Sequence, residues 1–154
     1  MRLADYIRSE LILPSLHADD TESTIRALSE HLAEQHVVEN CAEVIQALMD
    51  RERLHTTVVG RGVAIPHATV GSVDSTILLV AVSPDAIRFG PPESEPCRIF
   101  FVLLSPPGRE SEHIKLLARL SRLVHHPGFV ERLGGAGSTE GVLEAIREVD
   151  SQHV

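Results

Sequence analysis

The chain has 154 residues and a formal net charge of −8, a length that fits one domain able to bury most of the surface of its unfolded form. Hydrophobic residues make up 43% and charged residues 23%, which is close to the average of folded proteins and argues against intrinsic disorder. The acidic balance argues against nucleic acid and anionic membrane surfaces as partners, because both require a basic patch. We therefore expect a globular protein that binds other proteins or small ligands.

The sequence shows no segment that predicts secretion or membrane insertion. Its first residues lack the apolar stretch and the cleavage site of a signal peptide, and no apolar run approaches the roughly 20 residues of a membrane-spanning helix. Cys41 and Cys97 lie far apart and form no CxxC motif, so reduced thiols are expected rather than a metal or redox centre. We expect a cytoplasmic protein that holds no metal and needs no cofactor.

The first half of the chain predicts two helices followed by short strands. One helix is expected to follow the N-cap residues Asp19–Thr21, and a second begins near Asn40. Apolar residues recur at helical spacing after both starts. Two short β-prone pieces, 56–59 and 62–65, come next, and Pro66 is expected to end the second.

The second half predicts two buried strands and three helices. Its two apolar segments are nearly continuous, as strands must be when helices cover both faces of their sheet. The expected strands are 76–83 and 97–105, the loop between them is 84–96, and the helices are one capped by Ser111, one at 129–133 and one at about 139–149. Because helices and strands interleave, the simplest architecture is a layered α/β domain.

Of the nine histidines, His67 stands out by its neighbours. It follows Pro66 at the expected end of a strand and precedes Ala68, so its ring should emerge among small side chains. Upstream, Gly60-Arg61-Gly62 would let the backbone approach an anion closely, which makes Gly60, Arg61 and Gly62 candidate phosphate-binding residues. The alternative is a histidine that only caps a turn. The glycines match neither a dinucleotide fingerprint nor a Walker A loop, so a nucleotide site lacks support.

His113 is the second candidate, because it lies in the first turn of a helix, on the apolar side. Unpaired N–H groups at that end of a helix attract anions. A half-buried structural histidine is the alternative for any one such residue, but two inward histidines near such backbone indicate an anion site, and we expect their rings side by side. Five other histidines lie in polar surroundings and are expected to be solvated: His17, His31, His36, His55 and His153. His125 and His126 close a helix before Pro127, and a metal site is the weaker interpretation of that pair.

The segment from Arg51 to Ala68 reads R-E-x4-T-x2-G-x-G-V-A-I-P-H-A. It resembles the signature of the EIIA domains of the phosphotransferase system, of the fructose, mannitol and nitrogen-regulatory type. The resemblance continues through the two apolar strands to E-H-I-x-L-L-A-x-L at Glu112–Leu120 and on to the closing helix. It thus covers nearly the whole chain and implies one EIIA type-2 domain, residues 1–154, with a mixed β-sheet covered by helices.

The resemblance implies a phosphotransferase with a phosphohistidine intermediate. His67 would accept a phosphoryl group from an HPr-type carrier protein and pass it to an EIIB domain or to a regulated target protein. His113 would stabilise the phosphorylated ring, and Arg51 would bind the phosphate. Neutral imidazole is nucleophilic near neutral pH, and phosphoryl transfer needs positioning and positive charge more than covalent help.

Several functions stay open within this resemblance. No EIIB or membrane EIIC segment adjoins the domain, which favours a role in nitrogen, potassium or carbon regulation over a dedicated sugar-uptake role. The alternatives are a sugar-specific EIIA subunit and a docking-only regulatory module; a hydrolase or metalloenzyme is weaker, since zinc prefers more ligands. Two segments depart from the family pattern: residues 21–24 lack the lysine of many relatives, and 90–96 (GPPESEP) lack the common Asp-Gly turn.

Overall fold

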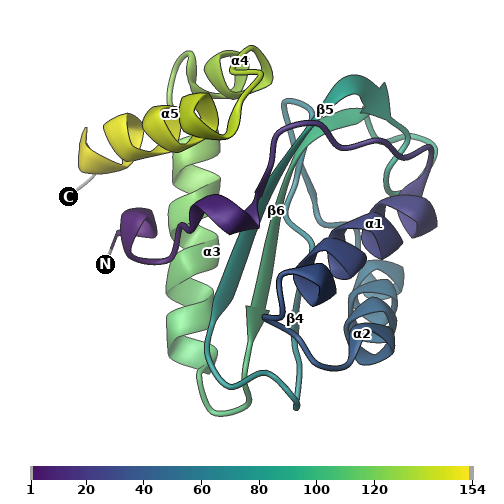
Figure 1. Ribbon diagram of the computed structural model, residues 1–154. Coiled ribbons are helices and arrows are strands. Elements are labelled where there is room, and N and C mark those ends of the chain that lie inside the picture. The colour runs from purple at the N-terminus through teal and green to yellow at the C-terminus, as the bar shows by residue number, and fades with distance from the viewer. Residues whose placement is uncertain (1, 153–154) are drawn as a thin grey trace.

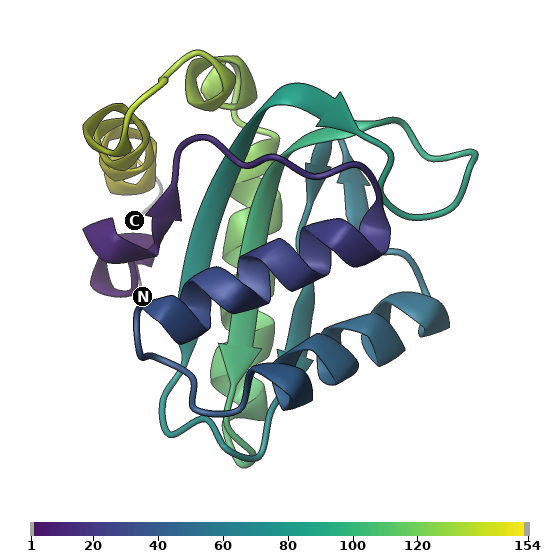
Figure 2. The same ribbon diagram turned by 45° about the vertical axis from the view of Figure 1, so that its right-hand side comes forward.

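The computed structural model describes residues 2–152. Within these residues the chain forms a mixed six-stranded sheet with helices on both faces (Figure 1). The turned view shows two helices of the first half crossing in front of the sheet and a long helix of the second half behind it (Figure 2). The predicted fold class, an α/β domain with a mixed β-sheet covered by helices, is confirmed.

Residues 2–152 contain five α-helices, two 3₁₀ turns and six strands. The helices are α1 (Thr21–Glu34), α2 (Cys41–Leu54), α3 (Glu110–Val124), α4 (Phe129–Gly134) and α5 (Thr139–Gln152), preceded by the 3₁₀ turns η1 (Leu3–Asp5) and η2 (Ser9–Leu11). The strands are β1 (Ile12–Leu13), β2 (Val58–Gly60), β3 (Val63–Ala64), β4 (His67–Thr69), β5 (Ile77–Ile87) and β6 (Cys97–Ser105). The sheet order is β1-β5-β6-β3-β2, and β4 also pairs with β6. The β5–β6 and β2–β3 pairs are antiparallel, whereas β1 joins β5, and β3 and β4 join β6, in parallel.

The central strands divide the core in two. On β6, Phe100 and Val102 pack with α1 and α2, whereas Phe101 and Leu103 pack with α3, α4 and α5. Successive side chains of a strand point to opposite faces, so a strand between two helical layers must be apolar at nearly every position. Burial of each such side chain contributes about 1.5–3 kcal/mol.

The first two helices begin where the sequence predicts. The Asp20 side chain accepts a hydrogen bond from the Ser23 N–H at 2.9 Å, and the Ser23 hydroxyl accepts one from the Asp20 N–H at 3.1 Å, which completes a capping box. The Asn40 side chain likewise accepts from the Glu43 N–H at 3.0 Å. These bonds satisfy N–H groups that the helices themselves leave unpaired.

Two predicted boundaries are wrong. α3 begins at Glu110, so Ser111 lies inside its first turn and does not cap it; Gly108, with a φ of 88°, already turns the chain toward the helix. β5 continues to Ile87, so the loop begins at residue 88 rather than at Pro84. Pro84 lies in an irregular, exposed stretch of β5, where its missing N–H costs no ladder bond.

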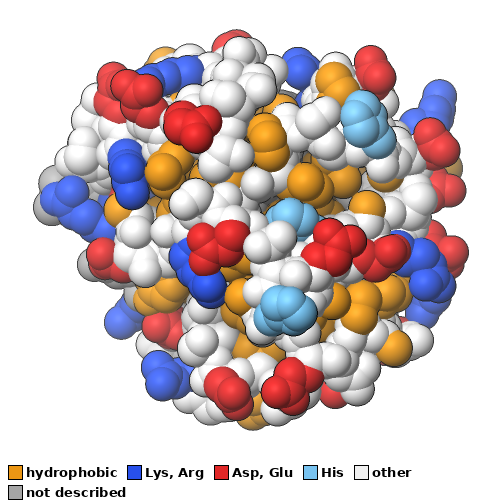
Figure 3. Space-filling model, viewed as in Figure 1, with side chains coloured by type: hydrophobic (Ala, Val, Ile, Leu, Met, Phe, Trp, Pro, Cys, Tyr) orange, Lys and Arg blue, Asp and Glu red, His pale blue; other side chains and the backbone are white. Residues whose placement is uncertain are grey.

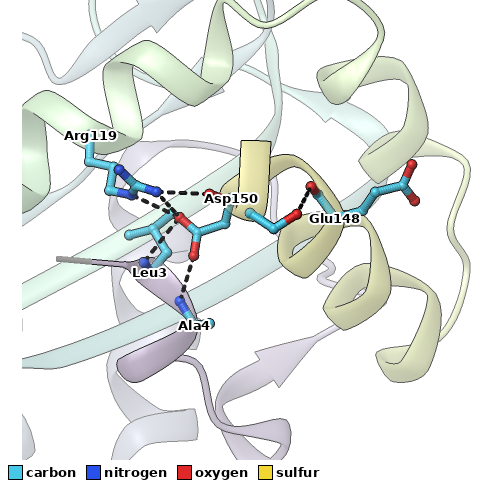
Figure 4. Close-up of polar contacts among 6 residues, drawn as sticks. Leu3, Ala4, Arg119, Glu148 and Asp150 are labelled. Carbon is cyan, nitrogen blue, oxygen red and sulfur yellow. Dashed lines mark hydrogen bonds and ion pairs between the residues drawn. The ribbon is translucent and has the colours of Figure 1, made fainter. Parts of the chain in front are cut away.

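A buried ion pair fastens the N-terminal segment to α3 and α5 (Figure 4). Arg119 Nε donates to Asp150 Oδ1 at 2.7 Å, and the backbone N–H groups of Leu3 and Ala4 donate to the same carboxylate at 3.2 and 3.0 Å. Only 6% of the Arg119 side chain and 1% of the Asp150 side chain are exposed. We refer to Leu3, Ala4, Arg119 and Asp150 as the terminal clasp, because it joins the two ends of the described chain.

The surface mixes both signs of charge. On the face of the molecule seen in Figure 1, basic and acidic side chains are interspersed with small hydrophobic patches and histidines (Figure 3). Among residues 2–152, no helix combines the length and the apolar character that crossing a membrane requires.

Candidate functional site

His67 and His113 lie next to each other at one end of the sheet. His67 is the first residue of β4 and pairs with Leu103 near the end of β6. His113 lies in the first turn of α3, the helix that follows β6. The centroids of the two imidazole rings are 5.5 Å apart, and the ring planes are inclined by 55°. The prediction that these rings lie side by side is confirmed.

The local structure around His67 differs from the prediction. Pro66 does not leave His67 at an open strand end, because a further strand, β4, begins at His67 itself. Pro66 has no N–H to donate, but its carbonyl oxygen accepts a hydrogen bond from the Leu103 N–H at 3.0 Å, so pairing with β6 continues past it. As a result the His67 ring is half-buried rather than exposed.

One hydrogen bond sets the tautomer of His67. Its Nδ1 lies 2.7 Å from the carbonyl oxygen of Ile65. A carbonyl oxygen can only accept, so Nδ1 must carry the hydrogen. In the neutral ring this leaves the lone pair on Nε2. Nε2 is therefore the atom of His67 that can act as a nucleophile.

His113 is held by the end of β6. Its Nδ1 lies 2.7 Å from the Oγ of Ser105, the last residue of that strand. When this hydroxyl donates to Nδ1, the hydrogen of the neutral His113 ring is on Nε2, which becomes a donor. Sequence reasoning missed Ser105; the available signal was a hydroxyl residue at the end of an otherwise apolar strand.

Both rings have a pKa below the ordinary histidine value of 6.5. Burial is the main cause for each, since it disfavours the charged form. For His67, the hydrogen bond to Ile65 opposes the lowering of the pKa, and the positive charge of Arg51 adds to it. For His113, the pKa is lowered further by His67 and by Arg51. Both imidazoles are thus neutral at neutral pH.

Arg51 lies on the last turn of α2, and its positive charge lowers the pKa of both imidazole rings. Its Nη1 donates to the carbonyl oxygen of His55 at 2.9 Å, which holds the guanidinium at the end of the helix. The adjacent Glu52 accepts from the N–H and the hydroxyl of Thr57 at 2.9 and 2.5 Å, and so fixes the chain that leaves α2. The structure therefore places three of the predicted residues, His67, His113 and Arg51, in one electrostatic environment.

Contrary to the prediction, Gly60, Arg61 and Gly62 do not join this site. Gly60 ends β2, and Arg61 and Gly62 form the turn to β3. The Gly62 carbonyl accepts from the Arg98 N–H at 2.8 Å, near the start of β6 rather than its end. The Gly62 N–H is already bonded to the Glu95 carboxylate, so it is not free for a phosphate. The φ angles of the three residues are 100°, 57° and 74°, a left-handed turn that explains the glycines without an anion.

The remaining candidates for chemistry are clusters of metal-binding side chains and the two cysteine thiols. Within residues 2–152, no three or more His, Cys, Asp or Glu side chains gather in a way that could hold a metal ion. Cys41 and Cys97 are free thiols, as predicted. Burial, followed by the charges of Glu95 and Glu52, raises the pKa of the Cys97 thiol to about 12. Cys97 is therefore protonated and unreactive as a nucleophile.

Residues 5–149 match the family described as the phosphoenolpyruvate-dependent sugar phosphotransferase system, EIIA 2. The chain belongs to this family. This EIIA domain is 30% identical, over 146 residues, to the nitrogen regulatory protein of Bradyrhizobium diazoefficiens, and the match covers 95% of each chain. The family resemblance inferred from the motifs around His67 and His113 is thereby confirmed.

Solved structures of related proteins share the fold of this EIIA domain. It matches the nitrogen regulatory protein IIA-Ntr of Neisseria meningitidis with a TM-score of 0.85 and 24% identity, over 94% of this chain and 98% of that one. It also matches the complex of enzyme IIAMTL and phosphorylated enzyme IIBMTL of Escherichia coli with a TM-score of 0.78 and 28% identity, over 92% of this chain and 97% of that one. Both regulatory and sugar-system proteins thus have this architecture.

Proposed function

We propose that this EIIA domain is a phosphohistidine carrier in which His67 is phosphorylated and His113 and Arg51 stabilise the phosphoryl group. The observation that supports it best is the hydrogen bond from Nδ1 of His67 to the Ile65 carbonyl oxygen, beside a second half-buried imidazole. This bond leaves Nε2 as the free nucleophile. Burial keeps both rings uncharged at neutral pH, the form that the nucleophile must have.

The transfer step needs no separate base. Nε2 of His67 attacks the phosphorus of a phosphohistidine on an HPr-type carrier protein. A nitrogen–phosphorus bond forms to Nε2 while the bond to the carrier's ring breaks, and its electron pair stays with the carrier's nitrogen. The His67 ring becomes more positive as its lone pair is used, which strengthens the bond from Nδ1–H to the Ile65 carbonyl oxygen.

The neighbours of His67 supply positive electrostatics to the phosphoryl oxygens. Charge on those oxygens must be stabilised throughout a loose, metaphosphate-like transition state. His113 offers Nε2–H when Ser105 donates to its Nδ1, and Arg51 adds a full positive charge. Groups that are already oriented in the folded protein stabilise such a transition state without further reorganisation.

The family suggests the partners and the setting. We infer an HPr-type carrier as the donor and an EIIB domain or a regulated target protein as the acceptor, in the cytoplasm. The match to a nitrogen regulatory protein along 95% of both chains favours regulation over sugar uptake. A sugar-specific EIIA subunit is the second candidate, because the family description names a sugar phosphotransferase system.

The test is incubation with phosphoenolpyruvate, enzyme I and an HPr-type carrier protein, followed by intact-mass measurement. We expect a gain of one phosphoryl group that is labile in acid and stable in base, as expected for a phosphoramidate, located on His67. No mass gain, while the carrier itself becomes phosphorylated, would leave a docking-only module as the better function.

Replacement of His113 by alanine should slow transfer while His67 remains the labelled residue. Loss of one preorganised donor typically lowers a rate on the order of 10²–10³-fold, equivalent to roughly 3–4 kcal/mol. Rapid-quench experiments on the His113→Ala variant should show this loss both in uptake from the carrier and in back-transfer to it. If instead the variant took up no phosphate and His67→Ala did, the two roles would be reversed.

Phosphoryl uptake should be insensitive to pH around neutrality and should fall only in acid. The pKa of His67 in the folded protein is lowered from 6.5, so the ring keeps its lone pair at a pH where an ordinary histidine is already half protonated. The rate should drop as the pH falls through that lowered pKa. Parallel NMR titration of the His67 ring checks the cause, and a measured pKa at or above 6.5 for this ring would contradict it.

A further inference from the structure

Two hydroxyl groups just beyond the last printed pair of the β5–β6 ladder hold successive residues of α3. Ile77 pairs with Leu104 in this antiparallel ladder, so Thr76 and Ser105 are opposite each other one step further on. The Ser105 hydroxyl bonds to the His113 ring at 2.7 Å, and the Thr76 hydroxyl donates to the carboxylate of Glu112. The first turn of α3 is therefore attached to the sheet at two adjacent residues, of which the proposed function uses one.

The Glu112 carboxylate also binds the N-terminal segment. The Tyr6 hydroxyl, which follows η1 in the chain, donates to Oε2 of Glu112 at 2.8 Å, while Thr76 donates to Oε1. These two hydrogen bonds, from Thr76 and then Tyr6, lower the pKa of Glu112, so the carboxylate is ionised. Burial and the bond to Glu112 raise the pKa of Tyr6 to about 12, so its hydroxyl keeps the hydrogen it donates. Each carboxylate oxygen thus has its own donor.

The Glu112 carboxylate is bonded to Thr76 and Tyr6 and not to the His113 ring. The groups that lower the pKa of His113, besides its burial, are His67 and Arg51. The link from Glu112 to the His113 ring that these bonds provide is the helix turn that both residues share. Such a turn matters because a misplacement of about 1 Å in a reacting group can cost on the order of 10²-fold in rate.

We propose that Glu112 is a positioning residue, which holds the first turn of α3 through Tyr6 and Thr76 and so keeps the His113 ring against His67. This inference rests on the proposed phosphocarrier function and adds to it a residue outside the phosphoryl site. It also makes the N-terminal segment part of the active-site support, because Tyr6 provides one of the two bonds.

The test is the Glu112→Ala variant with two measurements. Uptake of phosphate from a phosphorylated HPr-type carrier should slow by roughly 10-fold. In NMR titration, the pKa of His113 should rise toward its ordinary value as the loosened ring becomes more solvated, whereas the pKa of His67 should not change. Glu112→Gln, which keeps the shape and can bond to both hydroxyls, should restore most of the rate and the lowered pKa of His113.

Glu110 offers a matched control, because it is an acidic residue in the same first turn whose carboxylate bonds to the Gly108 N–H at 3.2 Å. Glu110→Ala should leave uptake and both pKa values as in the wild type. Equal effects of Glu110→Ala and Glu112→Ala would instead assign the effect to charge at the helix end and overturn the positioning role. Wild-type uptake and an unchanged His113 pKa in Glu112→Ala would overturn it as well.

Tyr6→Phe keeps the proposal testable if Glu112→Ala does not fold, since it removes one hydroxyl and leaves the bond from Thr76. It should slow uptake by a smaller factor, and the Tyr6→Phe/Glu112→Ala double variant should be no slower than Glu112→Ala alone, because both changes break the same link. Independent, multiplying effects would contradict this link. If the wild type takes up no phosphate, the phosphocarrier function fails, but the NMR titration still decides whether Glu112 positions His113.

Discussion

Alanine in place of His67 should abolish phosphoryl uptake from an HPr-type carrier protein. The substitution removes Nε2, the atom whose lone pair is left free by the bond from Nδ1 to the Ile65 carbonyl oxygen. His113 should not substitute for it, because its Nε2 carries a hydrogen when Ser105 donates to Nδ1. Intact-mass measurement after incubation with phosphoenolpyruvate, enzyme I and the carrier should show no added phosphoryl group.

The fold of His67→Ala should persist at slightly reduced stability. The ring is half-buried and makes one hydrogen bond to backbone, and the loss of such a bond typically costs about 1 kcal/mol. His67→Asn is the matched control, because its Nδ2 amide stands in for Nδ1 and can still donate to the Ile65 carbonyl oxygen but offers no imidazole nitrogen. Both variants should be unlabelled and folded. Labelling of either one to the wild-type level would remove His67 from the proposed role.

Alanine in place of Asp150 should lower the free energy of unfolding by about 3–5 kcal/mol, the cost of breaking a buried ion pair from one side. It leaves the guanidinium of Arg119 buried without its carboxylate, and the N–H groups of Leu3 and Ala4 lose their acceptor. Unpaired buried polar groups carry the full cost of desolvation. Equilibrium unfolding in urea measures this change directly.

An exposed ion pair between α4 and α5 provides the comparison, because its glutamate lies on the same helix as Asp150. Arg132 Nη1 and Glu148 Oε2 are 2.6 Å apart, but 39% of one side chain and 56% of the other are exposed. Glu148→Ala should therefore change the free energy of unfolding by less than about 1 kcal/mol. If Asp150→Ala cost no more than Glu148→Ala, the terminal clasp would not stabilise the fold as described.

Periodicity and turn residues predicted the regular parts of the fold well. The starts of α1 and α2 followed from Asp20 and Asn40, since capping is a local interaction that a short stretch of sequence can reveal. The two central strands followed from continuous apolar residues. β1 was not predicted, because a two-residue strand is too short for any period, and its pairing with β5 depends on residues about 70 positions away.

The candidate site was predicted only as far as its imidazoles and its arginine. His67 and His113 were found from their neighbours and from the family motif, but the supporting groups come from elsewhere in the chain. Ser105, Thr76 and Tyr6 contact α3 only because the end of β6, the start of β5 and the residue after η1 all lie beside the first turn of that helix. Gly60–Gly62 misled because a glycine turn suited to an anion looks, in sequence, the same as one that binds a carboxylate of its own chain.

The terminal clasp also leads to an expectation about the order of events in folding. Its hydrogen bond from Leu3 to Asp150 closes a separation of 147 residues, and because closing so long a loop costs entropy that only other contacts can offset, we expect it to form late. Contacts made late in folding affect the unfolding rate far more than the folding rate. The amides of Leu3 and Ala4 should accordingly exchange with solvent by local opening at the chain ends, while those of β5 and β6 exchange only when the whole domain unfolds.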